Sequence, residues 1–289
     1  MMISATTLSS YLYCARKLWL QKVLDLKEPM KDVVVLGTVT HQTYNAINRQ
    51  DQETVQSVPL KATYAEILEN YTKKFAALLR WSVASNKHSL KNVNVPLLKA
   101  FTHAWPMIQR EAEMRSQNVY KNIQQHGVSG EALWDKLTPK IKSEYNVKSE
   151  EIELKGIIDQ LEVHRTFVRP IELKTGKAPA EGVWPGHRLQ VAVYALILEK
   201  MLGTQVEDAV VHYLEANVAR TVKIDAQAKA EVIELKDKVK ELLASTVPPP
   251  KTTEASKCES CGLRGKCHDE GFVQAKAKSL NTSQRIAIP

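Results

Sequence analysis

Asp159 and the triplet Glu172-Leu173-Lys174 are of the types and spacing that could hold and use a divalent metal ion. Asp159 is expected to end an apolar strand, where a carboxylate is costly unless it is solvated or bound to a cation. Glu172 and Lys174 are two residues apart, so on a strand both side chains leave the same face. Carboxylates and the backbone carbonyl of Leu173 suit a hard cation such as Mg²⁺ or Mn²⁺. A lysine beside that ion can orient or deprotonate water, which fits hydrolysis of a phosphodiester.

Other polar residues could join this group, although each has a simpler explanation. His41 follows Gly37 by one helical turn, and an imidazole can join carboxylates around a metal; alternatively it is a hydrogen-bonded core histidine. Gln190 and Tyr194 share one helical face and suit contacts to phosphate or water, unless they only form a solvated edge. In the same way, Glu172 and Lys174 could be a surface ion pair on an edge strand, which contributes little to stability.

The four cysteines suggest a second metal centre. Cys258, Cys261 and Cys267 lie close together near the end of the sequence, and Cys14 lies near its start. Four thiolates suit either a tetrahedral zinc ion or a [4Fe–4S] cluster. A ligand at Cys14 would connect the two ends of the chain. In the alternative arrangement, Cys14 is a free thiol and His268 completes a zinc site.

The chain that must position these residues has a mixed α/β pattern. Helical periodicity predicts a helix over residues 4–24, a helix from about residue 37, an all-helical stretch over about 60–140 and helices over 186–202 and 226–245. After about residue 144 the pattern predicts a hairpin of strands 151–163 and 166–174, and a second hairpin of strands 209–215 and 219–224. We divide the chain into N-terminal helices (1–59), a helical insertion (60–143), a sheet-containing core (144–250) and a cysteine segment with a loose tail (251–289).

Composition excludes several classes of protein. Hydrophobic residues make up 44% of the sequence and charged residues 25%, as in globular rather than disordered or fibrous proteins. No run approaches the roughly 18 apolar residues that span a bilayer, and no secretory signal is visible, so we expect a cytoplasmic protein without a membrane. Lys and Arg number 40 against 32 Asp and Glu, a net charge of +8 that is compatible with a polyanionic partner.

Taken in order, these motifs resemble a RecB-like nuclease of the PD-(D/E)xK superfamily, and more narrowly the CRISPR-associated exonucleases of the Cas-four family. The resemblance covers roughly residues 4–50 and 144–270, and it implies a restriction-endonuclease-like core with a helical insertion. The motifs that carry it are Tyr13-Cys14-Ala15-Arg16-Lys17-Leu18-Trp19, Gly37 to His41, Gly156-Ile157-Ile158-Asp159, Glu172-Leu173-Lys174-Thr175-Gly176, Gln190 to Tyr194 and Cys258 to Cys267.

The resemblance also assigns roles to residues. His41, Asp159 and Glu172 would bind the catalytic metal with the carbonyl of Leu173, and Lys174 would be the catalytic lysine. Gln190 and Tyr194 would match a Gln-x-x-x-Tyr helix, and Glu144 stands where relatives often carry an acid. The four cysteines, Cys14, Cys258, Cys261 and Cys267, would hold a [4Fe–4S] cluster that joins the termini.

The expected function is a Mg²⁺- or Mn²⁺-dependent exonuclease acting on single-stranded DNA ends or overhangs. In the family, such enzymes process fragments for CRISPR spacer integration alongside integrase proteins. A stand-alone repair or viral recombination exonuclease and a non-hydrolytic DNA-binding subunit are the alternatives. Ala15 departs from the proline usual in relatives.

Two basic tracks could guide the DNA. One consists of cations around the cysteines, and the other of cations in the insertion, which otherwise only packs against the core. The cations are Arg16, Lys17, Lys22, Arg264 and Lys266 for the first track, and Lys73, Lys74, Arg80 and Lys87 for the second.

Overall fold

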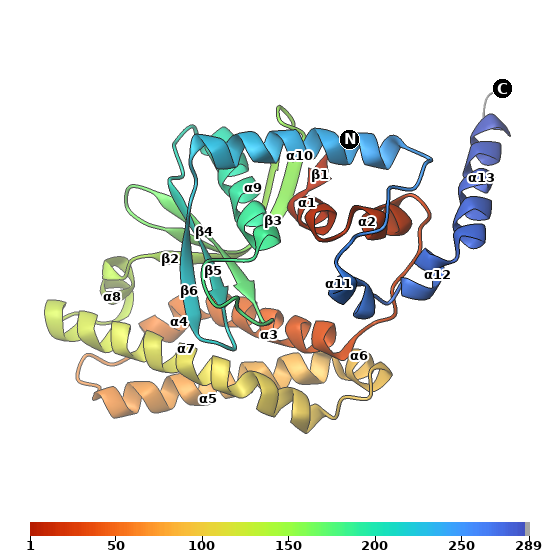
Figure 1. Ribbon diagram of the computed structural model, residues 1–289. Helices are drawn as coiled ribbons and strands as arrows, with labels where there is room; N and C mark the ends of the chain where they lie inside the picture. Colours follow the sequence, from red (N-terminus) through yellow and green to blue (C-terminus); the bar gives the residue numbers. More distant parts are fainter. Residues whose placement is uncertain (287–289) are drawn as a thin grey trace.

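A mixed β-sheet forms the centre of the molecule (Figure 1). The computed structural model describes residues 1–286 of the 289-residue chain. The strands follow the order β1-β3-β4-β5-β6, with β2 paired to β3. Their bounds are β1 (Ile3–Ser4), β2 (Lys140–Ser149), β3 (Leu154–Val163), β4 (Val168–Lys174), β5 (Asp208–Tyr213) and β6 (Val218–Lys223).

Helices cover both faces of this sheet. One face packs against α1 (Ala5–Tyr13), α9 (Pro185–Leu202) and α10 (Ala226–Ala244). The central helix, α9, is buried at every position from Leu189 to Leu198, because the sheet covers one side and α1 and α10 cover others. Such a helix is apolar all round rather than along one stripe.

The opposite face packs against the helical region. Its members are α3 (Asp32–Arg49), α4 (Asp51–Gln56), α5 (Tyr64–Ser85), α6 (Lys87–Asn92), α7 (Leu97–His126) and α8 (Gly130–Lys136). In Figure 1, α5 and α7 form a long helical pair beyond α3. Ile171 and Leu173 of β4 belong to the same buried apolar cluster as this region. The helices of the insertion are therefore continuous with the core of the sheet.

The two ends of the chain meet beside the sheet. The helices α11 (Ala255–Glu259), α12 (Arg264–His268) and α13 (Glu270–Ile286) lie next to α2 (Ala15–Lys22) in Figure 1. A small apolar cluster joins them, and Arg16 of α2 donates to the carboxylate of Glu270 at 2.9 Å. The buried members of the cluster are Trp19, Leu20, Leu24, Leu26, Leu263, Val273 and Ala277. We call this contact between the chain ends the clasp.

Strands β3 and β4 separate in the middle of the sheet. They pair from Val163 and Val168 as far as Gln160 and Ile171. Beyond this point β3 instead pairs with the short strand β1, at Leu154 and Lys155. Residues 156–159 therefore border an opening between neighbouring strands.

The main elements expected from the sequence are present, with some differences. Both hairpins are antiparallel pairs, and the helices expected over 186–202 and 226–245 are α9 and α10. The sheet starts earlier than residue 144, because β2 begins at Lys140. The helix expected over 4–24 is broken at Cys14, which is extended with φ −166° and ψ 106°. The expected loose tail is wrong as far as Ile286, the end of α13, and residues 287–289 lie outside the described residues.

Within the described residues, no helix combines the length and apolar character required to cross a bilayer.

Candidate functional site

Asp159 lies at the opening between β3 and β4. It stands in the middle of β3, so the expectation that it ends a strand is wrong. Its Oδ2 accepts the backbone N–H of Leu173 at 2.8 Å, a bond that replaces the missing pairing of the two strands. Because the N–H and C=O groups of a strand residue point to the same side, the carbonyl of Leu173 also faces the opening. Because the strands separate here, the carboxylate of Asp159 and the carbonyl of Leu173 both face the opening.

Glu172 and Lys174 are held by polar side chains of α9. Lys174 Nζ donates to Glu172 Oε1 at 2.7 Å and to Gln190 Oε1 at 3.0 Å. Gln190 Nε2 donates to Glu172 Oε1 at 2.7 Å and to the hydroxyl of Tyr194 at 2.8 Å. Strand β4 lies between β3 and β5, and Glu172 is 4% exposed. Glu172 and Lys174 are therefore not a surface ion pair on an edge strand.

His41 and Glu144 lie close to Asp159, and the three form a cluster of potential metal ligands. One ligand atom of each of these three residues lies within 4.8 Å of the other two. His41 Nδ1 is 3.3 Å from Asp159 Oδ1, and its side chain is 29% exposed, so it is not a core histidine. Glu144 adopts a left-handed backbone with φ 48°, a conformation that strains an ordinary side chain and that is frequent at functional sites.

One carboxylate oxygen of the site has no protein partner. Glu172 Oε2 is buried and lacks a hydrogen-bond donor among the described residues, although buried polar atoms are normally bonded. Its carboxylate, the carboxylates of Asp159 and Glu144, the carbonyl of Leu173 and the imidazole of His41 are the donors that hard divalent cations take. This donor set fits a Mg²⁺ or Mn²⁺ ion.

The carboxylates of the site repel each other. Burial, together with the nearby charge of Asp159, raises the pKa of Glu172 to about 7, against the lowering effect of Lys174. Burial and Asp159 also raise the pKa of Glu144. Burial would lower the pKa of His41, but the hydrogen bond and charge of Asp159 outweigh it, so that pKa is raised. Excess negative charge of this kind favours a bound cation.

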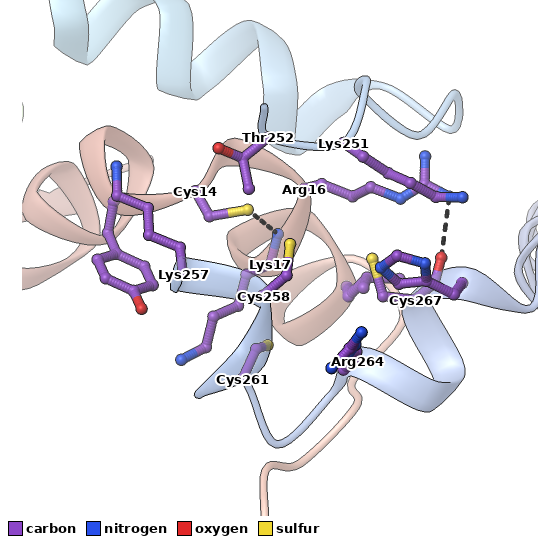
Figure 2. Close-up of a pocket in the computed structure, with 13 residues that line it drawn as sticks. Cys14, Arg16, Lys17, Lys251, Thr252, Lys257, Cys258, Cys261, Arg264 and Cys267 are labelled. Carbon is purple, nitrogen blue, oxygen red and sulfur yellow. Dashed lines mark hydrogen bonds between the residues drawn. The ribbon is translucent and has the colours of Figure 1, made fainter. Parts of the chain in front are cut away.

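The four cysteines line a second pocket, shown in Figure 2. Cys14 lies between α1 and α2, and its Sγ accepts the backbone N–H of Lys17 at 3.4 Å. Cys258 and Cys261 come from α11 and the turn after it, and Cys267 comes from α12. The break of the helix at Cys14 is thus what turns this side chain towards the other three.

Cations surround the cysteine pocket. Arg16, Lys17 and Arg264 line it as expected, whereas Lys22 and Lys266 are exposed and do not line it. Additional lining residues are Lys251, Lys257 and His268. Arg16 is 5% exposed and bonds the carbonyl of Pro249 and the carboxylate of Glu270. It belongs to the clasp and is not available to a DNA phosphate.

Two features of the carboxylate site depend on the folded chain. Glu144, which the resemblance gives only as an acid found at this place in relatives, lies on strand β2, whose exposed side carries charges. Gly156 is required because a Cβ there would come 2.5 Å from Cε1 of Tyr194, a contact between residues far apart in sequence. The local sequence contains no signal for either feature.

Sequence comparisons relate the chain to known nucleases. The profile of the "PD-(D/E)XK nuclease superfamily" matches residues 2–268. A "CRISPR-associated exonuclease Cas4/endonuclease Cas1 fusion" of Leptospira interrogans is 26% identical over 151 residues, 49% of this chain and 28% of that protein. A fusion with the same description from Myxococcus xanthus is 30% identical over 44% of this chain and 23% of that protein.

The description of a third relative names no fusion. The "CRISPR-associated exonuclease Cas4" of Rhodospirillum rubrum is 30% identical over 42% of this chain and 37% of that protein. The aligned regions thus span about a quarter of the two fusion proteins and little more than a third of this relative.

Proposed function

Because the chain belongs to the PD-(D/E)XK nuclease superfamily, we propose that it is a metal-dependent DNA exonuclease acting on single-stranded ends or overhangs. The observation that carries the proposal is the meeting of His41, Glu144 and Asp159 at the opening between β3 and β4. The network of Glu172, Lys174, Gln190 and Tyr194 lies on the adjacent strand and helix.

Each residue of the carboxylate site has a role in the proposed reaction. Asp159 and Glu172, with Glu144, His41 and the Leu173 carbonyl, would hold a divalent cation, which when bound supplies Lewis-acid activation and charge stabilisation. Lys174 is a donor beside the carboxylates, positioned to hydrogen-bond the scissile phosphate or the attacking water. The side chain of Gln190 fixes both the Lys174 ammonium and the Glu172 carboxylate, so both keep one geometry before substrate arrives.

Three substitutions test the active site. Asp159→Ala and Glu172→Ala should each abolish Mn²⁺-dependent digestion of a labelled single strand. Lys174→Ala should slow it at least about a hundredfold, the size of a lost electrostatic group in the transition state. Binding of the same strand without divalent ions, and the melting temperature, serve as controls for folding. Undiminished cleavage by any of the three would remove that residue from the site. Labelling the 5′ or 3′ end in turn gives the polarity.

We propose in addition that Cys14, Cys258, Cys261 and Cys267 hold a [4Fe–4S] cluster. The four side chains line one pocket, and four thiolates suit such a cluster or a tetrahedral zinc ion. The similarity of the chain to Cas4 exonucleases, together with the resemblance of the cysteine motifs to that family, supports the cluster. The lining cations would offset the negative charge of four thiolates.

Metal content and absorption distinguish the two centres. Protein purified without oxygen should be brown, absorb broadly near about 400 nm and contain about four irons per chain. A colourless protein with one zinc per chain would decide against the cluster. In that case His268, which lines the same pocket, becomes a candidate ligand to test by substitution.

The pathway proposed is CRISPR adaptation, with an integrase protein as partner. It is supported by the descriptions of the similar proteins, two of which are fusions of a Cas4 exonuclease with a Cas1 endonuclease. Co-purification of this chain with a Cas1 integrase from the same organism, together with spacer acquisition in the presence and absence of the chain, tests the assignment. Normal acquisition without the chain would favour a separate repair role. The cytoplasmic location expected from the sequence stays a prediction.

A further inference from the structure

An exposed surface of β2 and β3 leads away from the carboxylate site. In this antiparallel pair, Asn146 lies opposite Ile157 and Lys148 lies opposite Lys155. The flanking pairs of the same register place Glu144 opposite Asp159. Because every second pair of a sheet lies on the same face, these three pairs form one row that begins at the carboxylates and ends at two lysines.

The two lysines are not explained by the stability of the sheet. Like charges directly opposite each other on neighbouring strands are destabilising. Lys148 is 3.5 Å from Glu150, but both side chains are more than two thirds exposed, so this pair contributes little. Lys155 has no ion pair among residues 1–279, whose side chains are described. A bound anion would remove the repulsion between the two ammonium groups.

Protection of a sheet edge does not explain Lys155 either. Lysines are common on edge strands, where they prevent pairing with other chains, and this could account for Lys148 on β2. Lys155, however, lies on β3 between two neighbours, since it also pairs with Ser4 of β1. Two residues further along β3, the apolar side chain of Ile157 is 49% exposed. The row thus combines cations and an exposed apolar residue on an inner strand.

A groove connects this row with the catalytic network. Lys148, Lys155, Asn146 and Ile157 line it together with Ser4 and Thr6 at the start of α1, and no acidic residue is among the lining residues. The first turn of α1 also carries no acid, so the positive end of its helix dipole adds to the potential of the groove. Tyr194, which bonds Gln190 in the catalytic network, lines the same groove.

We propose that this groove, lined by Lys148, Lys155, Asn146 and Ile157, binds the polynucleotide strand beside the cleavage site. This inference rests on the proposed nuclease function. The lysine pair lies four positions along each strand from the carboxylate pair, or about 13 Å away, which is about two nucleotides of an extended single strand. The two lysines contact the phosphate at that distance, as the cations of other grooves for single strands follow the backbone. Ile157 makes an apolar contact with the sugar or base between that phosphate and the cleaved bond.

The salt dependence of binding tests the proposal. The double variant Lys148→Gln/Lys155→Gln is compared with Lys121→Gln/Lys223→Gln, which removes two exposed lysines of α7 and β6. Affinity for a single-stranded oligonucleotide is measured over a range of salt without divalent ions. The slope of log affinity against log salt should fall by about 0.7, the value for one phosphate contact of a single strand, in the first variant and stay unchanged in the second. Equal slopes in the two variants would overturn the proposal.

A neutral phosphate locates the contact. An oligonucleotide with one methylphosphonate is moved through the positions around the cleaved bond. Wild-type protein should lose affinity when the neutral group lies about two nucleotides from that bond, and the Lys148→Gln/Lys155→Gln variant should not respond there. A response of equal size in both proteins would overturn the lysine contact. If wild-type protein neither binds nor cuts DNA, the nuclease proposal and the groove proposal both fail. If wild-type protein does both and the Lys148→Gln/Lys155→Gln variant behaves as wild type, the groove proposal alone fails.

Discussion

The glycine at position 156 sets how closely α9 approaches the sheet. A Cβ at this position would lie 2.5 Å from Cε1 and 3.0 Å from Cδ1 of the Tyr194 ring, and this ring is part of the network that holds Glu172. Gly156→Ala should therefore lower the free energy of unfolding by about 1–3 kcal/mol, the usual cost of overpacking, and reduce cleavage. Denaturant titration measures the first effect. Gly271→Ala is the control, because its new Cβ meets only Asp269 Oδ1 at 3.5 Å; equal stability of the two variants would contradict this reading.

His187 gives the fold a dependence on pH. Burial, with a contribution from the charge of Lys174, lowers its pKa from 6.5 to about 4, and its Nδ1 is 3.0 Å from the hydroxyl of Tyr213. In the unfolded chain this imidazole takes up a proton near pH 6.5, whereas the folded chain resists protonation down to about pH 4. Protonation of His187 therefore costs the folded chain no free energy of unfolding above pH 6.5. The free energy of unfolding declines as the pH falls from 6.5 to about 4.

The His187→Asn variant should show a smaller fall in melting temperature over this pH range than wild type, since the amide can still bond Tyr213 but does not titrate. His88→Asn, at an exposed position, should leave the fall unchanged. If His187→Asn follows the wild-type curve throughout, protonation of His187 is not what destabilises the protein in acid.

Among the elements, α3, α4 and α7 are joined by one arginine whose side chain is 10% exposed. Arg115 of α7 contacts Glu111 at 2.6 Å, Asp51 at 2.9 Å and the side chain of Asn48. Asn48 in turn donates to Ser143 Oγ at 2.5 Å, next to Glu144 on β2. The helical region thus supports the strand that brings an acid to the site.

Replacing this arginine should be costly. Arg115→Met leaves two carboxylates, 18% and 7% exposed, without their cation, so we expect a loss of about 3–5 kcal/mol in the free energy of unfolding. The triple variant Asp51→Leu/Glu111→Leu/Arg115→Met should recover most of it, because no buried charge remains unpaired. A single variant as stable as wild type would show that the carboxylates find other partners.

Buried helices and strands could be predicted from the sequence more easily than exposed ones. The strands β3 and β4 and the helix α9 could be predicted because buried apolar residues repeat at strand or helix spacing. Strand β2 could not be predicted, because the charged residues Lys142, Glu144 and Lys148 interrupt its apolar pattern. Strand β1 could not be predicted either, because it has only two residues. The residues of the carboxylate site could be proposed from the sequence. Their arrangement in space could not. The left-handed backbone of Glu144 and the contact of Gly156 with Tyr194 depend on strands and helices that meet only in the folded chain.

At the scale of the molecule, the clasp joins the chain ends by apolar contacts as well as through the cysteines. Leu263 is 1% exposed and packs with Trp19 and Leu20. Leu263→Ala should lower the free energy of unfolding by about 2–5 kcal/mol and speed amide exchange in both α2 and α13. Hydrogen exchange read by mass spectrometry checks this. Faster exchange confined to α13 would mean that the two ends are not coupled through this residue.

The clasp also has a consequence for how the protein is made. During translation Trp19 and Leu20 leave the ribosome first, and Leu263 follows after more than two hundred further residues. At 5–20 residues per second, the apolar side of α2 waits roughly ten to fifty seconds for the segment that covers it. Throughout that interval the nascent chain exposes an apolar surface that a chaperone can bind, and the cysteine pocket cannot close before Cys267 has left the ribosome.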